Sequence, residues 1–246
     1  MEYKKQLFKF DMARINNLSL YTFLVAFLLG MLINFLIAKN PLLITSKVYF
    51  DIILIIAIFI VGLALHEGIH ALSAVVFGKI GFKSVKFGVN ITQGMLYCHI
   101  TKPIKVGAYR IMLLLPALIT GLIPLIISAF LGNIFLVMVF SMLLCGGAGD
   151  FVMFMGMSKL KSDTLVIDHP KAPAFYAIYE SDKTPEDFQE VTAEQEEELL
   201  QEMKKSPFTT KDGQKKNGML KTFAILIFLA LAVLIVFIIG IIMSFL

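Results

Sequence analysis

Two histidines and a glutamate stand close together within residues 63–72, LALHEGIHAL, a stretch that is otherwise apolar. They form the H-E-x-x-H pattern. On an α-helix, residues four apart lie one turn above each other, so the imidazoles of His66 and His70 can converge on one tetrahedral zinc ion. Glu67 projects about 100° around the helix, beside such an ion, where it can take a proton from a water that the metal acidifies. The pattern predicts a Zn²⁺ site with His66 and His70 as ligands and Glu67 as the catalytic base. The alternative is structural, with two packing histidines and a buried glutamate that has internal partners.

A catalytic zinc ion usually takes three protein ligands and keeps one position for water. Asp150 is the other acidic residue that falls well inside an apolar segment, where an ionisable group is costly unless it is paired or bound to a cation. His66 and Asp150 each come about 16 residues into their apolar segments, so both reach a similar depth. The glycine-rich residues 146–149 let this helix approach another closely or unwind locally. We therefore predict Asp150 as the third ligand.

Two other places offer weaker ligand candidates. His99 lies in a stretch that reads as β-hairpin, where a surface role is the simpler interpretation. Asp168 and His169 precede Pro170, an arrangement typical of the start of a turn. Either residue of this pair can instead be an outer-shell partner of a metal ligand. His99 and Asp168 stay open as alternative third ligands.

The elements that must hold these residues are membrane spans. Of the 246 residues, 58% are apolar and only 16% are charged, which is typical of a polytopic membrane protein. A span needs about 20 apolar residues to cross a hydrocarbon core of roughly 30 Å. Five segments meet this requirement: 18–38, 48–77, 111–130, 134–156 and 219–246. The predicted fold is mainly α, a polytopic membrane helical bundle of about five spans.

Residues 80–106 change character, because short runs of Val, Phe, Ile and Tyr alternate there with polar residues and glycines. This pattern indicates a small insertion of one or two β-hairpins. A second polar region contains TAEQEEELLQEMKK, which favours a surface helix over 192–205. The predicted division is an N-terminal segment with the first span and an external loop (1–47), a zincin-like membrane core (48–157), a cytoplasmic polar segment (158–218) and a C-terminal span (219–246).

Lysine and arginine are distributed asymmetrically along the chain. With five spans that alternate in direction, residues 39–47 form an external loop with Lys39 and Lys47, and all other basic residues fall on the internal side. The positive-inside rule then predicts a multi-pass protein of the cell membrane with a cytoplasmic N-terminus. The net charge of +4 follows from this topology, so no nucleic acid is expected. The expected partners are the lipid bilayer and a peptide or membrane-protein substrate.

Several short motifs together resemble a bacterial membrane family described as zincin peptidases of unknown function. They are HEGIH (66–70), GMLYCHITKP (94–103), LLLPAL (113–118), GGAGDF (146–151) and VIDHP (166–170), and the resemblance covers about residues 50–180. More distantly, their order is similar to the core of site-2 proteases, which build an intramembrane zinc site. The resemblance implies that His66 and His70 are zinc ligands and that Glu67 is the base. It also implies that Asp150 is the third ligand. The sequence departs from site-2 proteases at Asp150, which is followed by Phe151 where they carry an Asp-Gly motif.

These observations predict a membrane-embedded zinc metallopeptidase that hydrolyses peptide bonds near the cytoplasmic side of the membrane. One alternative is a non-catalytic zinc-binding scaffold or a transporter that uses the same buried groups. A transporter is expected to show broken spans in matching halves, and the sequence has no internal symmetry. Another is an enzyme of a different type, because zinc activates water for attack on several electrophiles.

Overall fold

The chain divides into two compact units, and the helix with the H-E-x-x-H pattern contributes to both. Of the residues that the structure describes, the first unit takes those within 1–15, 67–115 and 149–205, and the second takes those within 16–66 and 116–148. The computed structural model describes residues 3–10, 12–37, 48–90, 95–169, 174–181 and 184–205.

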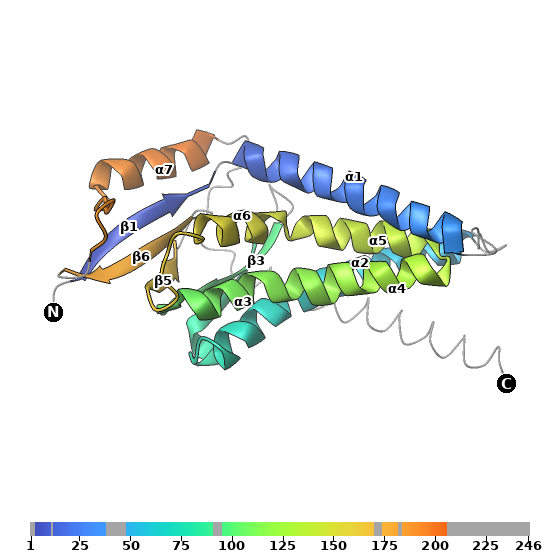
Figure 1. Ribbon diagram of the computed structural model, residues 1–246, viewed down its shortest axis with the longest axis horizontal. Helices are drawn as coiled ribbons and strands as arrows, with labels where there is room; N and C mark the ends of the chain where they lie inside the picture. Colours follow the sequence, from blue (N-terminus) through green and yellow to red (C-terminus); the bar gives the residue numbers. More distant parts are fainter. Residues whose placement is uncertain are drawn as a thin grey trace. The chain divides into compact units, whose positions relative to one another are not determined.

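Long apolar helices make up most of the structure (Figure 1). They are α1 (Met12–Ile37), α2 (Val48–Val76), α3 (Val106–Pro116), a π-helix (Ala117–Leu122), α4 (Ile123–Leu131), α5 (Ile134–Gly146) and α6 (Ala148–Gly156). Because the π-helix joins α3 to α4 and only Gly147 separates α5 from α6, the described residues form four helical runs that are long and apolar enough to cross a membrane. The fifth expected span, 219–246, lies outside the described residues.

The helices present large apolar side chains to their surroundings. Leu28 and Phe35 of α1 and Ile53 of α2 are all more than half exposed. A helix that is hydrophobic all round is either enclosed in a large core or placed in a membrane. The helices are therefore compatible with a membrane protein, while the direction in which the chain crosses stays a prediction.

A four-stranded antiparallel sheet belongs to the first unit. Its order is β1 (Tyr3–Lys9), β6 (Ala174–Glu180), β5 (Leu165–Asp168) and β4 (Ile104–Lys105). The fully buried Phe175 of β6 stacks on Phe8 of β1, with ring centroids 4.9 Å apart. Helix α7 (Ala193–Lys205) also contacts this sheet, since the Tyr176 hydroxyl donates to Glu196 at 2.8 Å. The N-terminal segment thus pairs with the polar region after the fourth apolar helical run, which the sequence did not indicate.

The predicted β insertion forms one hairpin, β2 (Val85–Asn90) and β3 (Met95–Ile100), with Lys86 opposite His99. A second strand pair begins in the same insertion, because β4 pairs with β5 of the larger sheet and not with the hairpin. The predicted class, mainly α with a small antiparallel β component, is therefore confirmed.

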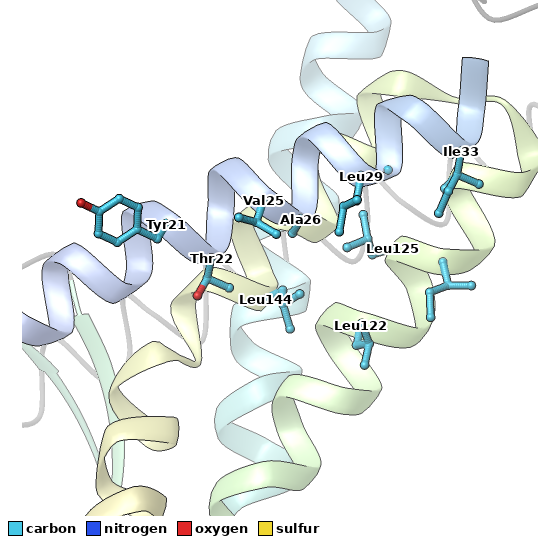
Figure 2. Close-up of a pocket in the computed structure, with 12 residues that line it drawn as sticks. Tyr21, Thr22, Val25, Ala26, Leu29, Ile33, Leu122, Leu125 and Leu144 are labelled. Carbon is cyan, nitrogen blue, oxygen red and sulfur yellow. The ribbon is translucent and has the colours of Figure 1, made fainter. Parts of the chain in front are cut away.

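In the second unit, α1, the π-helix with α4, and α5 enclose an apolar pocket of about 480 Å³ (Figure 2). Figure 2 shows Val25, Ala26 and Leu29 of α1 across from Leu122 and Leu125. No His, Asp or Glu lines it, so this pocket is distinct from the predicted metal site.

Close approach of two helices in this unit depends on Gly121 in the π-helix. A Cβ atom there would lie 2.8 Å from the Cα of Leu144 on α5. Because real Cβ atoms do not approach backbone so closely, glycine is the residue that lets the π-helix pack against α5.

Candidate metal centre

The H-E-x-x-H residues lie in the continuous helix α2, as the spacing predicts. His66 and His70 are 6% and 4% exposed, and Glu67 is half-buried. The possible ligand atoms of these three residues all lie within 4.8 Å of one another. Among the described His, Cys, Asp and Glu side chains, these three lie close enough together to hold one ion.

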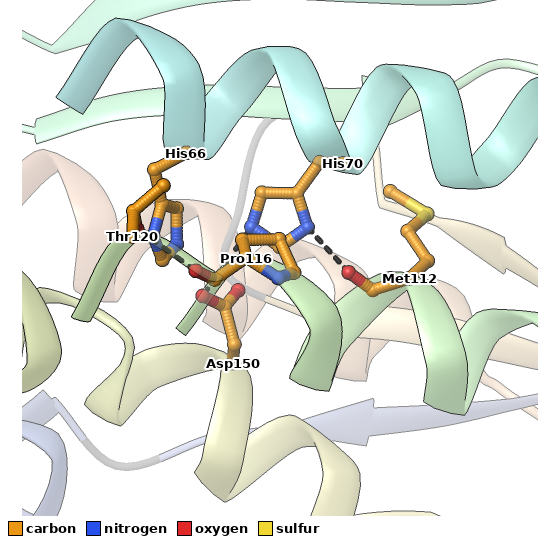
Figure 3. A network of polar contacts seen from close by, with 6 residues as sticks. All are labelled: His66, His70, Met112, Pro116, Thr120 and Asp150. Carbon is orange, nitrogen blue, oxygen red and sulfur yellow. Dashed lines mark hydrogen bonds and ion pairs between the residues drawn. The ribbon is translucent and has the colours of Figure 1, made fainter. Parts of the chain in front are cut away.

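Both ring nitrogens of His70 have polar partners (Figure 3). Its Nδ1 lies 2.8 Å from the carbonyl oxygen of Met112 on α3, and its Nε2 lies 3.3 Å from Oδ2 of Asp150 on α6. Two ligands that are each about 2.0–2.1 Å from a tetrahedral zinc ion are themselves about 3.3–3.4 Å apart. The separation of Nε2 and Oδ2 therefore suits two neighbouring ligands as well as it suits an ion pair.

Asp150 stands where one helix ends and another begins. Helix α5 ends at Gly146, Gly147 donates its N–H to the carbonyl of Leu144 at 3.2 Å, and α6 starts at Ala148 with Asp150 in its first turn. The positive end of a helix dipole favours a carboxylate at that position. The glycine-rich segment thus interrupts the helix just before the carboxylate, which gives Asp150 its direction toward His70.

His66 contacts the π-helix. Its Nδ1 lies 3.1 Å from Oγ1 of Thr120, and this hydroxyl donates to the carbonyl oxygen of Pro116 at 2.8 Å (Figure 3). Gly147 lies next to this ring, because a Cβ atom there would be in ordinary contact with Cε1 of His66 at 3.6 Å and too close to the Cβ of Ala117 at 2.9 Å. π-helical turns are rare and recur at functional sites, and this one supplies the partner of a histidine in the predicted metal site.

The donor set fits zinc. Two imidazole nitrogens and a carboxylate form a known set of catalytic zinc ligands, and the H-E-x-x-H order places the second carboxylate beside the ion. Both Glu67 and Asp150 lie near enough to His70 for either to serve as the third ligand. The assignment of Asp150 as ligand and Glu67 as base therefore remains a prediction, which the 3.3 Å contact supports.

His99, an alternative ligand, lies on strand β3 with its ring centroid 5.9 Å from that of Tyr97. Burial raises the pKa of its neighbour Cys98, and the charges of Glu67 and Asp168 raise it further, so these carboxylates lie near this part of β3. His99 therefore stays an alternative third ligand.

Asp168, the other alternative, holds three elements together. Its carboxylate, at the end of β5, accepts hydrogen bonds from the Tyr109 hydroxyl of α3 and, at 2.7 Å, from the backbone N–H of Ile100 on β3. Its neighbour His169 is 7% exposed and packs against Tyr176, with centroids 5.4 Å apart. These contacts give both residues structural partners in the sheet.

Sequence reasoning did not identify Met112, Pro116, Thr120 or Tyr109 as partners of the site. Of these, Pro116 carried a usable signal, because a proline inside an apolar span removes a helical hydrogen bond. The others depend on which backbone and side-chain groups happen to face the histidines and Asp168 after packing.

We predict that Asp168→Asn changes how stability depends on pH. Burial of the carboxyl raises the pKa of Asp168 to about 6, although hydrogen bonds from Tyr109 and Ile100 oppose the shift. Because the folded state holds this proton more tightly than the unfolded chain does, its stabilising effect is present below the unfolded value of 3.8 and is lost as the pH rises through about 6. As the pH is raised from about 4.5 to 7, the apparent Tm of the metal-free wild type should fall more steeply than that of the variant. The asparagine keeps an acceptor oxygen but does not titrate. Parallel curves for the two proteins would contradict this assignment.

Comparison with known proteins supports the predicted chemistry. No curated protein and no solved structure matches the chain, so the similarity to site-2 proteases rests on the order of motifs alone. A family model does match, over residues 59–165, a stretch that includes the H-E-x-x-H pattern, the β insertion and Asp150. The resemblance stated from the motifs is therefore confirmed for this part of the chain: residues 59–165 match the family described as putative zincin peptidase.

Proposed function

We propose that this protein is a membrane-embedded zinc metallopeptidase in which His66, His70 and Asp150 hold Zn²⁺ and Glu67 is the general base. The observation that carries the proposal is the contact of 3.3 Å between His70 Nε2 and Asp150 Oδ2, which joins an aspartate from a distant part of the chain to the H-E-x-x-H helix. The family match over residues 59–165 supports the same chemistry.

When bound, a zinc ion would polarise the scissile carbonyl and lower the pKa of the attacking water. Glu67 takes one proton from this water, and the resulting hydroxide adds to the carbonyl carbon of the peptide bond. Glu67 then passes the proton to the leaving nitrogen as the C–N bond breaks, so it is restored for the next turnover. Its half-buried position, directly after His66 in α2, leaves it accessible to a substrate.

The substrate is proposed to be an extended peptide segment near the cytoplasmic side of the membrane. A peptide bond inside a helix is protected by its backbone hydrogen bonds, so a segment must be extended before it is cleaved. Strand β3 is a suitable support for such a segment, because Cys98 on this strand lies close enough to Glu67 for the carboxylate to raise its pKa. Addition of a strand to the β2–β3 hairpin would bind substrate mainly through its backbone.

The lipid bilayer remains the proposed setting of this activity. The four apolar helices support a multi-pass protein of the cell membrane. The cytoplasmic position of the N-terminus is proposed from the distribution of lysine and arginine.

From the proposed metal site we expect the purified protein to contain about one zinc ion per chain. His70→Ala should lose most of this zinc, because it removes one ligand and the partner of Asp150. His99→Ala is the matched control, since it removes an imidazole from strand β3, outside the H-E-x-x-H helix, and it should keep its zinc if Asp150 is the third ligand. Metal content of the three proteins is measured by mass spectrometry. Equal zinc in wild type and His70→Ala would refute the site.

Glu67→Gln tests the base, because the amide keeps the size of the side chain but cannot take the proton. Zinc content should be unchanged, while cleavage of co-expressed small membrane proteins, followed by electrophoresis, should fall by about 10²- to 10⁴-fold. Glu190→Gln, an exposed acid far along the chain, should cleave at the wild-type rate. Full cleavage by Glu67→Gln would remove Glu67 as the base, and loss of zinc would make Glu67 a ligand in place of a base.

A further inference from the structure

We infer that Pro116 is a positioning residue that fixes the tautomer of both histidines, so that each has its proton on Nδ1 and its lone pair on Nε2. This inference deepens the proposed function and rests on it in one respect, because Nε2 is taken to be the atom that binds the metal. Pro116 is fully buried at the end of α3, directly before the π-helix. It affects His70 because it has no N–H group to donate to the carbonyl of Met112, and it affects His66 through its own carbonyl oxygen.

The effect on His70 begins with a missing hydrogen bond. In an α-helix the N–H of each residue donates to the carbonyl four residues earlier, so a residue with an N–H at position 116 would donate to the carbonyl of Met112. Proline has no N–H, so the usual helical donor to the carbonyl of Met112 is missing, and Met112 is only 2% exposed to water. An unpaired buried carbonyl is unfavourable. His70 Nδ1, at 2.8 Å from this oxygen, supplies the donor.

A carbonyl oxygen can only accept a hydrogen bond, so Nδ1 of His70 must carry the proton. In the neutral imidazole the other nitrogen, Nε2, then has a lone pair. Nε2 is the atom that lies 3.3 Å from Asp150 Oδ2, on the side proposed for the metal. The proline therefore selects the tautomer of His70 that can act as a ligand through Nε2.

The effect on His66 passes through Thr120. A hydroxyl group has one proton, and the Thr120 hydroxyl donates it to the carbonyl oxygen of Pro116 at 2.8 Å. Its contact of 3.1 Å with His66 Nδ1 must then be one in which the imidazole donates. His66 consequently has the same tautomer as His70, with the proton on Nδ1 and the lone pair on Nε2.

The π-helix after Pro116 completes this arrangement. Its backbone bonds span five residues, as in the bond from the N–H of Ile123 to the carbonyl of Leu118. This wider turn still leaves the Thr120 side chain within reach of the carbonyl of Pro116, one turn earlier (Figure 3). Hydrogen bonds to the second nitrogen of a metal-binding histidine orient the ring and raise its basicity, and their loss typically weakens metal binding by about 10- to 100-fold.

The test uses two variants, each of which is expected to affect a different histidine. Pro116→Ala supplies an N–H that competes with His70 for the carbonyl of Met112, so it should move His70 away from the Nδ1–H tautomer. Thr120→Val removes the hydroxyl but keeps the shape, so it should release His66 and leave His70 unchanged. Pro124→Ala is the control, because this second proline of the same helical run lies eight residues after Pro116 and contacts neither histidine in the described hydrogen bonds.

Two measurements are made on each protein. Side-chain ¹⁵N NMR of the metal-free protein, at a pH high enough to leave both imidazoles neutral, reports the tautomers, and competition with a chelator reports the zinc Kd. We expect both wild-type histidines to carry the proton on Nδ1, and both variants to raise the Kd by about 10- to 100-fold. Circular dichroism checks that each variant keeps its helices, and if Pro116→Ala loses them, Thr120→Val alone decides the His66 half of the inference.

The outcomes separate this inference from the proposed function. If wild type binds zinc but its histidines are protonated on Nε2, or if folded Pro116→Ala and Thr120→Val keep wild-type tautomers and zinc affinity, the inference is wrong and the metal site stands. If the tautomers respond as expected but wild type binds no zinc, the proposed function is wrong and the role of Pro116 in setting the tautomers stands.

Discussion

An ionisable group among apolar helices is stable only if it is paired or bound to a cation, and this constraint governs the centre of the molecule. Helix α2 buries two imidazoles and brings Glu67 beside them. Each histidine has a partner from another helix, Thr120 for His66 and the carbonyl of Met112 for His70. The remaining nitrogen of His70 faces a carboxylate, which is itself suited to a cation.

Satisfying these groups requires irregular backbone at defined places. In a regular α-helix the interior carbonyls accept from backbone N–H groups, so a buried carbonyl that loses this donor needs another one. Pro116 and the π-helix interrupt the pattern in the third helical run, and Gly147 interrupts it in the fourth, just before Asp150. Both interruptions fall where a histidine needs a partner. Irregular backbone in apolar surroundings is tolerated where other protein groups satisfy it, which is the situation of Met112 and Pro116.

The sequence predicted the parts of this centre that depend on local geometry. His66, Glu67 and His70 share one helix, so their spacing of one turn determines their relation whatever the rest of the chain does. Asp150 could be connected to them through the matching depth of two spans, which is a property of membrane proteins and not of sequence spacing. The partners Thr120 and Met112 could not be predicted in this way, because their roles depend on how α2 is rotated against its neighbours.

The strand pairing of the sheet was even harder to predict from the sequence than the partners of the histidines. Strand β1 pairs with β6, over 160 residues later in the chain, and neither strand has a sequence pattern from which its partner can be predicted. Asp168 looked like the start of a turn because Pro170 follows, yet its carboxylate joins β3, α3 and β5. Long-range pairing is decided by the packing of complete elements, here by Phe8 and Phe175, and a single sequence contains little information about it.

The central claim, that these buried groups form one zinc site, is tested most directly by locating the metal. Diffraction data collected at the zinc absorption edge from crystals of the zinc-loaded protein would give its position independently of any assumed ligand. The account predicts one strong peak about 2.0–2.2 Å from His66 Nε2, His70 Nε2 and an oxygen of Asp150, with Glu67 outside the coordination sphere. A peak coordinated elsewhere, or zinc bound through Glu67 with Asp150 apart from it, would contradict the account.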